Sequence, residues 1–400
     1  MNILNKVIIF LVGGLFIFSG LIKLNDPVGT QIKLEEYFEV FSEDLKEKPA
    51  QVSINGETEP IPADQIKETT LSKFFIALKP YALSIALLMS ALEVILGVNL
   101  LTGYRLRFTL WLLLLMILFF TFLTYYSWAY DKVQDCGCFG DAIKLTPKQS
   151  FMKDVVLTAL IGVLFFQRKR LVPNAGPKVG LAFNLVATAL SFGLGLYATY
   201  YLPPIDFRAY KVGVSIPDQM EYSGEPQYGQ EKYIYTNLDT QEEEVYNQWE
   251  EKLGDTLKYE FKAYEKPLLN PEVLPKITDF NVWNAEGDYT DSVFTGNKLL
   301  IIVEDVQKTD LPTFEEVPAL VKNLDQMNVE VWLLSASSND LVEALRHQYQ
   351  LAIPAFSVDG KVLKTMARAN PSFILLQEGV VKAKWPHRKM PNATSIKQLL

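Results

Sequence analysis

The two cysteines of this 400-residue chain, Cys136 and Cys138, are separated by a single glycine. A disulfide that closes so small a ring is strained, and strain makes a disulfide easier to reduce and therefore a stronger oxidant. Gly137 supplies the backbone freedom that such a ring needs. The spacing is thus suited to a pair that cycles between dithiol and disulfide, which would be the catalytic group of a redox protein.

Two other interpretations of this loop stay open. In the first, the cysteines and the flanking Asp135 and Asp141 hold a metal ion, although this is a poor set of ligands for a three- or four-coordinate site. In the second, the thiols only pack inside a tight loop that re-enters the membrane. The two aspartates also disfavour a thiolate, so local charge by itself does not activate the pair. Phe139 and Gly140 would fold the loop back toward the rest of the protein.

The elements that must position this loop are apolar. The chain is 49% hydrophobic with a mean hydropathy of +0.10, and its apolar residues gather in five runs in the first half. Each run approaches the roughly 20 residues that cross a bilayer as a helix. The net charge of -8 argues against a nucleic-acid partner, which requires a basic face. We predict a membrane domain over residues 1–202, with spans at about 7–25, 77–101, 108–130, 150–167 and 179–202.

The distribution of basic residues predicts how these spans are oriented. Segments 1–6, 102–107 and 167–178 carry lysine or arginine and no acidic residue. Basic segments stay on the cytoplasmic side of a membrane, so the N-terminus is predicted to be cytoplasmic. The cysteine loop and everything after Leu202 then lie outside, most simply in the periplasm beside a bacterial inner membrane. Disulfides persist in that compartment.

Three motifs carry a resemblance to a known family. The sequence DCGCFGD followed by KLTPKQSFMKD resembles the signature of the MauE branch of the DoxX membrane family. FSGLIKLNDPVGT and SALEVILGVNLLTG resemble the first and second helices of that family. The resemblance covers roughly residues 5–170 and implies a four-helix membrane bundle that acts in disulfide formation or electron transfer. A complete relay of this kind uses two cysteine pairs, whereas this chain has one.

Several polar residues fall within or beside the predicted spans. A charge inside a bilayer is costly, so Glu93 should face the bundle interior and have a polar partner. Lys23, nearer the end of its span, could instead extend to the membrane surface. Ser19, Lys23 and Asp26 are expected to share an outward-facing pocket with the cysteines. We expect hydrogen bonds between helices from four further residues: Asn99, Thr121, Thr124 and Asn184.

The second half of the chain reads as a soluble domain. Residues 203–276 suggest a linker with a small sheet and an acidic helical stretch inside it. Residues 277–400 follow the order strand, helix, strand, helix, hairpin, which resembles a membrane-anchored, TlpA-like thioredoxin fold. That resemblance implies a cis peptide bond before Pro371. The slot for its active-site cysteines, residues 306–312, reads VQKTDLP and contains none, so this domain cannot exchange thiols.

These observations favour a membrane-bound thiol–disulfide or electron-transfer component that acts on a periplasmic thiol protein. A quinone would suit it as a membrane-soluble cofactor, and lipid is its other expected partner. The alternative from a different class is a non-enzymatic, membrane-anchored scaffold whose thioredoxin-like domain binds a periplasmic protein. A third is a small-molecule carrier that uses a cavity around Glu93. The economy of cysteine favours the first, and the cysteine-free soluble domain favours the second.

Overall fold

The computed structural model describes residues 3–47, 53–54, 57–58, 66–133 and 137–400. The chain forms two compact units, which we describe separately. The first, called here the helical unit, comprises Met1–Arg208 with the short segments Ala367–Ser372 and Trp385–Met390. The second, called here the α/β unit, comprises the rest of the chain from Ala209 onward.

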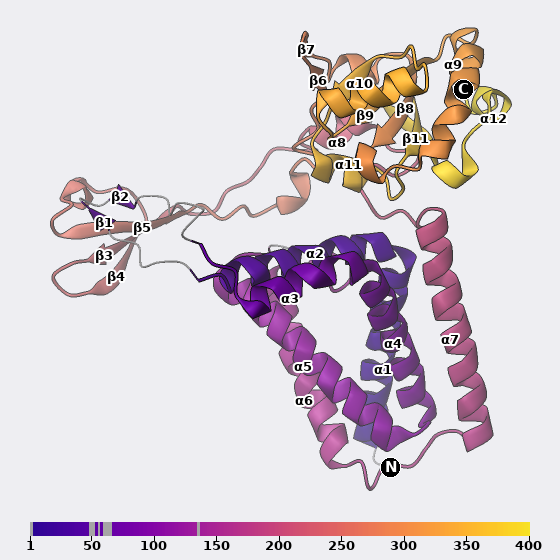
Figure 1. The fold of residues 1–400 in the computed structure, drawn as a ribbon. Coiled ribbons are helices and arrows are strands. Elements are labelled where there is room, and N and C mark those ends of the chain that lie inside the picture. Colours follow the sequence, from indigo (N-terminus) through magenta and orange to yellow (C-terminus); the bar gives the residue numbers. More distant parts are fainter. Residues whose placement is uncertain (1–2, 48–52, 55–56, 59–65, 134–136) are drawn as a thin grey trace. The chain divides into compact units, whose positions relative to one another are not determined.

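The helical unit confirms the five predicted spans. In the described part of the chain, five helical segments are long and apolar enough to cross a membrane. The second of them is a continuous 33-residue segment in which α3 and a short 3₁₀ turn run into α4 (Figure 1). The helices are α1 (Ile3–Asn25), α3 (Thr70–Leu78), α4 (Ala82–Thr102), α5 (Leu106–Tyr130), α6 (Pro147–Phe166) and α7 (Pro177–Tyr200).

Local sequence explains where these helices begin, end and meet. Thr146 and Gln149 form a capping box at the start of α6, with Pro147 at its first position. Helix α4 ends at Gly103, which adopts the left-handed conformation that glycine tolerates best. Helices α1 and α4 approach closely because each has a glycine where they cross, Gly13 in α1 and Gly97 in α4. A Cβ atom added to Gly97 would lie only 2.7 Å from the carbonyl oxygen of Gly13.

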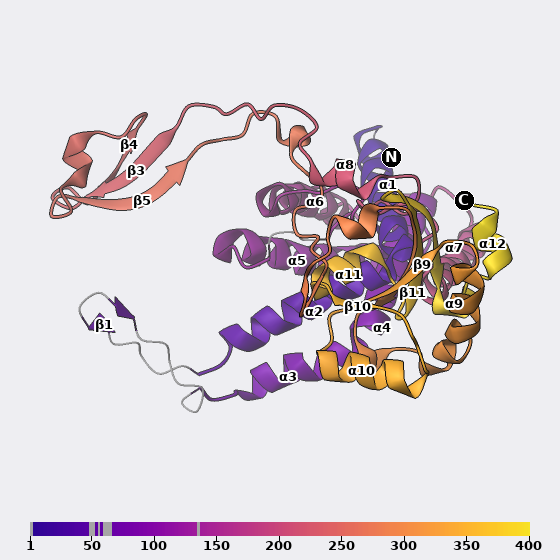
Figure 2. The same cartoon turned by 90° about the horizontal axis from the view of Figure 1, so that it is seen from above.

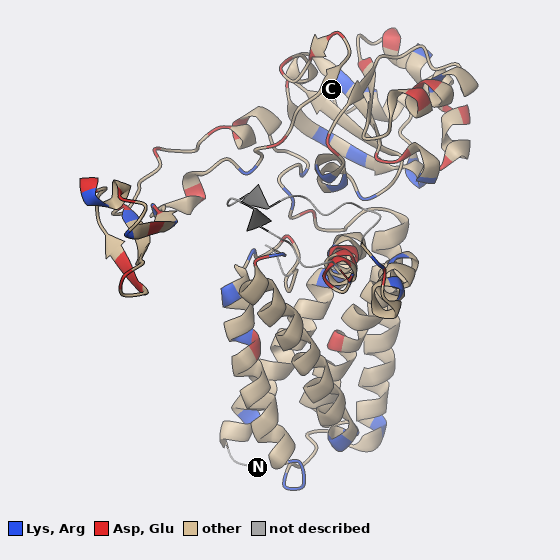
Figure 3. Cartoon of the chain, turned by 60° about the vertical axis from the view of Figure 1, so that its left-hand side comes forward, with Lys and Arg blue, Asp and Glu red and all other residues tan. Residues whose placement is uncertain are grey.

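The basic segments meet at one end of the helical unit. The Asn5 side chain donates a hydrogen bond to the Gln167 side chain at 2.8 Å, which joins the start of α1 to the end of α6. The Asn174 side chain donates to the carbonyl oxygen of Leu101 at 2.9 Å, which joins the turn after α6 to the end of α4. Figure 3 shows lysine and arginine gathered at this end, where the N-terminus lies. The grouping of these three segments on one side is therefore confirmed.

The acidic segment between the first two spans contains a helix that the sequence did not reveal. Helix α2 (Pro27–Asp44) begins at Asp26, whose carboxylate accepts a hydrogen bond from the Gly29 amide. Its apolar face, including Leu34 and Phe38, packs on Ala82 and Ala86 of α4. Helices α2 and α3 lie side by side in Figures 1 and 2. The helix is too polar to resemble a span, and only its packing partners identify its apolar face.

The α/β unit contains a seven-stranded mixed sheet and a separate three-stranded sheet among the described residues. The larger sheet has the order β12-β11-β8-β9-β10-β6-β7, with β8, β9 and β10 parallel to one another and β6 antiparallel to β10. The strands are β6 (Trp283–Asn284), β7 (Gly287–Asp288), β8 (Asn297–Val303), β9 (Glu330–Ser335), β10 (Ala355–Ser357), β11 (Ser372–Gln377) and β12 (Val380–Pro386). The helices are α8 (Ile216–Met220), α9 (Val317–Asp325), α10 (Asn339–Gln348), α11 (Gly360–Met366) and α12 (Ala393–Lys397).

The predicted order of strand, helix, strand, helix and hairpin over residues 277–400 is found in β8, α9, β9, α10 and the β11–β12 hairpin, with further short elements added. Strand β10 is three residues long and helix α11 seven, and neither was predicted. The peptide bond between Asn370 and Pro371 is cis, as predicted. The hairpin of β11 and β12 turns at Glu378 and Gly379, which both have positive φ, as its two-residue turn requires.

The smaller sheet corrects one expectation. It has the order β4-β3-β5, built from β3 (Lys232–Asn237), β4 (Glu242–Tyr246) and β5 (Tyr259–Glu265). We predicted an acidic helix between β3 and β5, but residues Glu242–Tyr246 form a strand antiparallel to β3. Pairing with β3 supplies the backbone hydrogen bonds and brings aromatic side chains together, and this outweighs the helix propensity of the glutamates.

Candidate functional site

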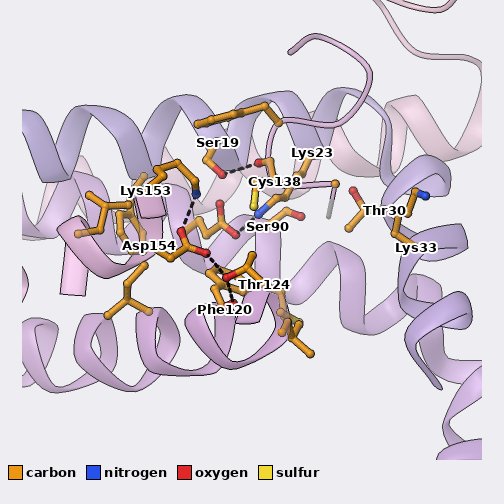
Figure 4. Close-up of a pocket in the computed structure, with 18 of the residues that line it drawn as sticks. Ser19, Lys23, Thr30, Lys33, Ser90, Phe120, Thr124, Cys138, Lys153 and Asp154 are labelled. Carbon is orange, nitrogen blue, oxygen red and sulfur yellow. Dashed lines mark hydrogen bonds and ion pairs between the residues drawn. The ribbon is translucent and has the colours of Figure 1, made fainter. Parts of the chain in front are cut away.

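The loop that carries Cys138 lines a cavity inside the helical unit. The walls come from α1, α2, α4, α5 and α6, and most of the lining side chains are apolar. The cavity has an empty volume of about 800 Å³, its open mouth included. Figure 4 shows Lys23, Lys153 and Asp154 directed into the same space as Cys138. Apolar walls with a few convergent polar groups are typical of ligand and cofactor sites.

The loop is held against the bundle on both sides of Cys138. Gly137 and Gly140 have positive φ values of 64° and 49°, which explains why both are glycine. The Ser19 hydroxyl donates a hydrogen bond to the carbonyl oxygen of Cys138 at 3.0 Å. Phe139 is buried and its ring contacts that of Phe18, with the ring centroids 5.7 Å apart. The loop therefore folds back toward the bundle as predicted, and it places Cys138 over the cavity.

The predicted burial of Glu93 is confirmed. Glu93 is 1% exposed, and its carboxylate forms an ion pair with the Lys23 ammonium at 2.5 Å. Lys23 is 8% exposed, so it turns into the bundle and does not extend to the membrane surface. Its ammonium also lies 4.6 Å from the ring centroid of Phe120. Two charges this deeply buried are tolerated because each neutralises the other.

A second ion pair, between Lys153 and Asp154 of α6, was not predicted. The Lys153 ammonium lies 2.6 Å from the Asp154 carboxylate, which is completely buried. The Thr124 hydroxyl of α5 donates a hydrogen bond to the same carboxylate at 3.1 Å. The sequence offered one signal for this pair, because adjacent charges a third of the way into a span are as costly as the charge at Glu93.

The remaining predicted residues divide between this site and other roles. Asp26 caps α2 and is not among the residues that line the cavity. Asp141 is partly exposed in the turn that follows Phe139 and does not line the cavity either. The predicted pocket thus contains Ser19, Lys23 and Cys138 but excludes Asp26. Asp135 and Cys136 lie outside the described residues.

The predicted hydrogen bonds between helices are present. The Asn184 side chain of α7 donates to the Asn99 side chain of α4 at 3.0 Å. Thr121 of α5 and Thr158 of α6 are joined through their hydroxyls at 3.0 Å. Thr124, the fourth predicted residue, is the donor to Asp154. Among the residues that the structure describes, no group of three or more His, Cys, Asp or Glu could hold a metal ion.

The α/β unit offers no thiol for exchange. The segment after β8 where a thioredoxin fold carries its cysteines forms short 3₁₀ turns at Val306–Lys308 and Leu311–Glu315. Neither contains a cysteine. Thiol exchange in this chain is therefore confined to the cysteine loop of the helical unit.

One family model matches part of the chain. Residues 67–167 match the family described as methylamine utilisation protein MauE. This segment is about a quarter of the chain and contains Glu93, the cysteine loop, Lys153 and Asp154. Helix α1, with Ser19 and Lys23, lies outside it. No curated protein and no solved structure matches the chain. Over the matched helices, the chain is similar to a MauE-type membrane protein.

Proposed function

We propose that this protein is a membrane-bound thiol–disulfide component, in which Cys136 and Cys138 exchange electrons with a partner protein outside the cytoplasm. The observation that carries the proposal is the position of Cys138 over a cavity that holds two lysine–carboxylate pairs, one of them fully buried and the other with a buried carboxylate. A thiol that served only as packing would not require charges at this cost beneath it. Clefts that gather charged groups in this way are candidates for sites that carry out chemistry.

The exchange follows ordinary disulfide chemistry. A dithiol on the partner loses two electrons and two protons to the Cys136–Cys138 disulfide, which leaves the partner oxidised and the pair reduced. The pair must then pass the two electrons to an acceptor. A lipid-soluble quinone would supply that acceptor, because it takes up two electrons and two protons. The mostly apolar cavity walls suit such a ring, and the lysines suit its carbonyl oxygens as hydrogen-bond donors.

The basic end of the helical unit is proposed to face the cytoplasm, which places the cysteine loop in an oxidising compartment. The α/β unit is proposed to be thioredoxin-like and to bind the partner protein, because it has the sheet of such a fold without its cysteines. A cysteine introduced at Thr240 in a background without native cysteines should react with a membrane-impermeant maleimide in intact spheroplasts. Protection until lysis would reverse the orientation.

Trapping of mixed disulfides tests the redox function. In cells that express the full chain, Cys138→Ser should leave Cys136 able to hold a partner in a covalent complex that reductant releases. The double variant Cys136→Ser/Cys138→Ser should capture nothing, and it is the matched control. Stability should change little, because a ring this small removes little chain entropy. Full complementation of a deletion strain by the double variant would refute the redox function and favour the anchored scaffold.

A further inference from the structure

Lys153 is placed to influence the chemistry of the cysteine loop. It lies on α6 and lines the same cavity as Cys138. Its ammonium is 5.3 Å from the ring centroid of Phe139, the residue that follows Cys138. Side chains adjacent in a helix normally diverge, but the long lysine stem bends back through the cavity to reach Asp154 at 2.6 Å. The positive charge is thereby held beneath the cysteine loop.

The charges around the cavity are nearly balanced. The titratable residues that line it, besides Cys138, are Lys23 of α1, Lys33 and Tyr37 of α2, Glu93 of α4, and Lys153 and Asp154 of α6. Lys23 pairs with Glu93 and Lys153 pairs with Asp154. Lys33 pairs with Glu36, which does not line the cavity, at 3.0 Å. A thiolate formed at Cys138 would therefore have to share a cation that already has a partner.

Lys153 is better suited to that sharing than Lys23. The Lys23 side chain is 10% exposed and its carboxylate partner 2%, so the two charges are sequestered together. The Lys153 side chain is 23% exposed, which shows that its charge is less enclosed. Lys153 also lines the same cavity as Cys138, and its ammonium lies over the ring of the next residue, Phe139. Asp154, by contrast, is fixed, because Thr124 holds its second oxygen at 3.1 Å.

We propose that Lys153 is the cation that stabilises the thiolate of Cys138, and that Asp154 is a positioning residue that sets how much of this charge reaches the sulfur. The inference rests on the proposed function, in which that thiolate is a leaving group. A partner thiolate attacks Cys136, the bond between the two sulfurs breaks, and its electron pair remains on Cys138. A stabilised thiolate leaves faster. The sequence alone, with only aspartates beside the cysteines, suggested the opposite environment.

Alkylation of Cys138 tests the inference without requiring turnover. In the Cys136→Ser background, Cys138 is the single thiol of the chain. The rate of its reaction with iodoacetamide is measured against pH on the full-length protein in nanodiscs. Lys153→Met should raise the pH midpoint of the reaction and lower its rate at pH 7 by about tenfold, because a nearby opposite charge shifts the pKa of a thiol by about one unit or more. Asp154→Asn should lower the midpoint, because it frees Lys153 from its partner.

The opposite signs of the two shifts distinguish an electrostatic effect from a structural one. Loosening of the loop would change access in the same direction for both variants. Lys153→Arg should keep the midpoint near that of the parent, and Lys148→Met, which removes an exposed lysine from the same helix, should leave it unchanged. Shifts of the same sign, or none, would overturn the inference. Opposite shifts in a protein that traps no partner would uphold it and refute the proposed function.

Discussion

Each of the two units buries a lysine, but the carboxylate that pairs with it is buried in one unit and exposed in the other. In the helical unit, the side chains of Lys23 and Glu93 are only 10% and 2% exposed, so both charges are removed from solvent. In the α/β unit, the side chain of Lys298 is 3% exposed, yet its partner Glu330 is 64% exposed at 3.4 Å. Lys298 also donates to the carbonyl oxygen of Thr295 at 2.6 Å. Loss of one partner would leave a buried, unpaired charge in the helical unit. In the α/β unit the carboxylate would remain solvated.

The helical unit gathers several polar groups into one site, whereas the described part of the α/β unit has a single charged residue in its core. Strand β8 is buried along almost its whole length, and Lys298 is one polar position in an otherwise apolar layer. The helical unit instead gathers two ion pairs and a cysteine around one cavity. Buried charges are expensive in a membrane, and three of these four residues, Lys23, Glu93 and Asp154, are buried, which makes this cavity the candidate site of the chain. The following three predictions test this contrast.

The largest effect is expected at Lys23. Lys23→Met leaves the Glu93 carboxylate buried without its cation, which should destabilise the helical unit by about 3–5 kcal/mol. The double variant Lys23→Met/Glu93→Met should recover most of this loss, because two apolar side chains of similar size pack without a charge. Hydrogen exchange of peptides from α1 and α4 in nanodiscs measures both changes. A double variant as unstable as the single one would show that the pair does not act as a unit.

A smaller effect is expected at Lys298. Lys298→Met removes one hydrogen bond and the contact of its ammonium with Trp332, but it leaves Glu330 solvated. The expected destabilisation is about 1 kcal/mol, the usual net value of one hydrogen bond. Hydrogen exchange of peptides from β8 and β9 reports it, with α1 and α4 as the internal reference. A loss as large as that of Lys23→Met would erase the contrast between the two units.

The smallest effect is expected at Asn184. Asn184→Leu removes its hydrogen bond to Asn99, which is a single neutral contact between α7 and α4. Neutral hydrogen bonds between membrane helices contribute about 0.6 kcal/mol on average. The thermal unfolding temperature of the purified protein in detergent should therefore fall only slightly. Displacement of α7 by this variant would indicate that the bond fixes the helix, which would place Asn184 closer in importance to the ion pairs.

Much of the site could be predicted from residue type alone. Glu93 was identified because a carboxylate in an apolar run must find a partner, and the structure supplies one. Ser19 and the two glycines of the cysteine loop were identified from their spacing, and they hold Cys138 over the cavity. Asp26 was assigned to the same pocket because it is near in sequence. It caps a helix instead, since capping is satisfied locally by the Gly29 amide.

The sequence by itself determined five helices long and apolar enough to span a membrane, the meeting of their basic turns at one end of the unit, and most strands of the α/β unit, but not β4 or β10. Each of these depends on apolar periodicity, chain length or local charge, which are properties of neighbouring residues. Only the tertiary structure decided which lysines line the cavity with Cys138. Lys23, Lys33 and Lys153 come from three different helices, and the rotation of each helix is set by packing on the others. The charge around a cysteine is a sum over space, so the two aspartates near it in sequence supply only part of it.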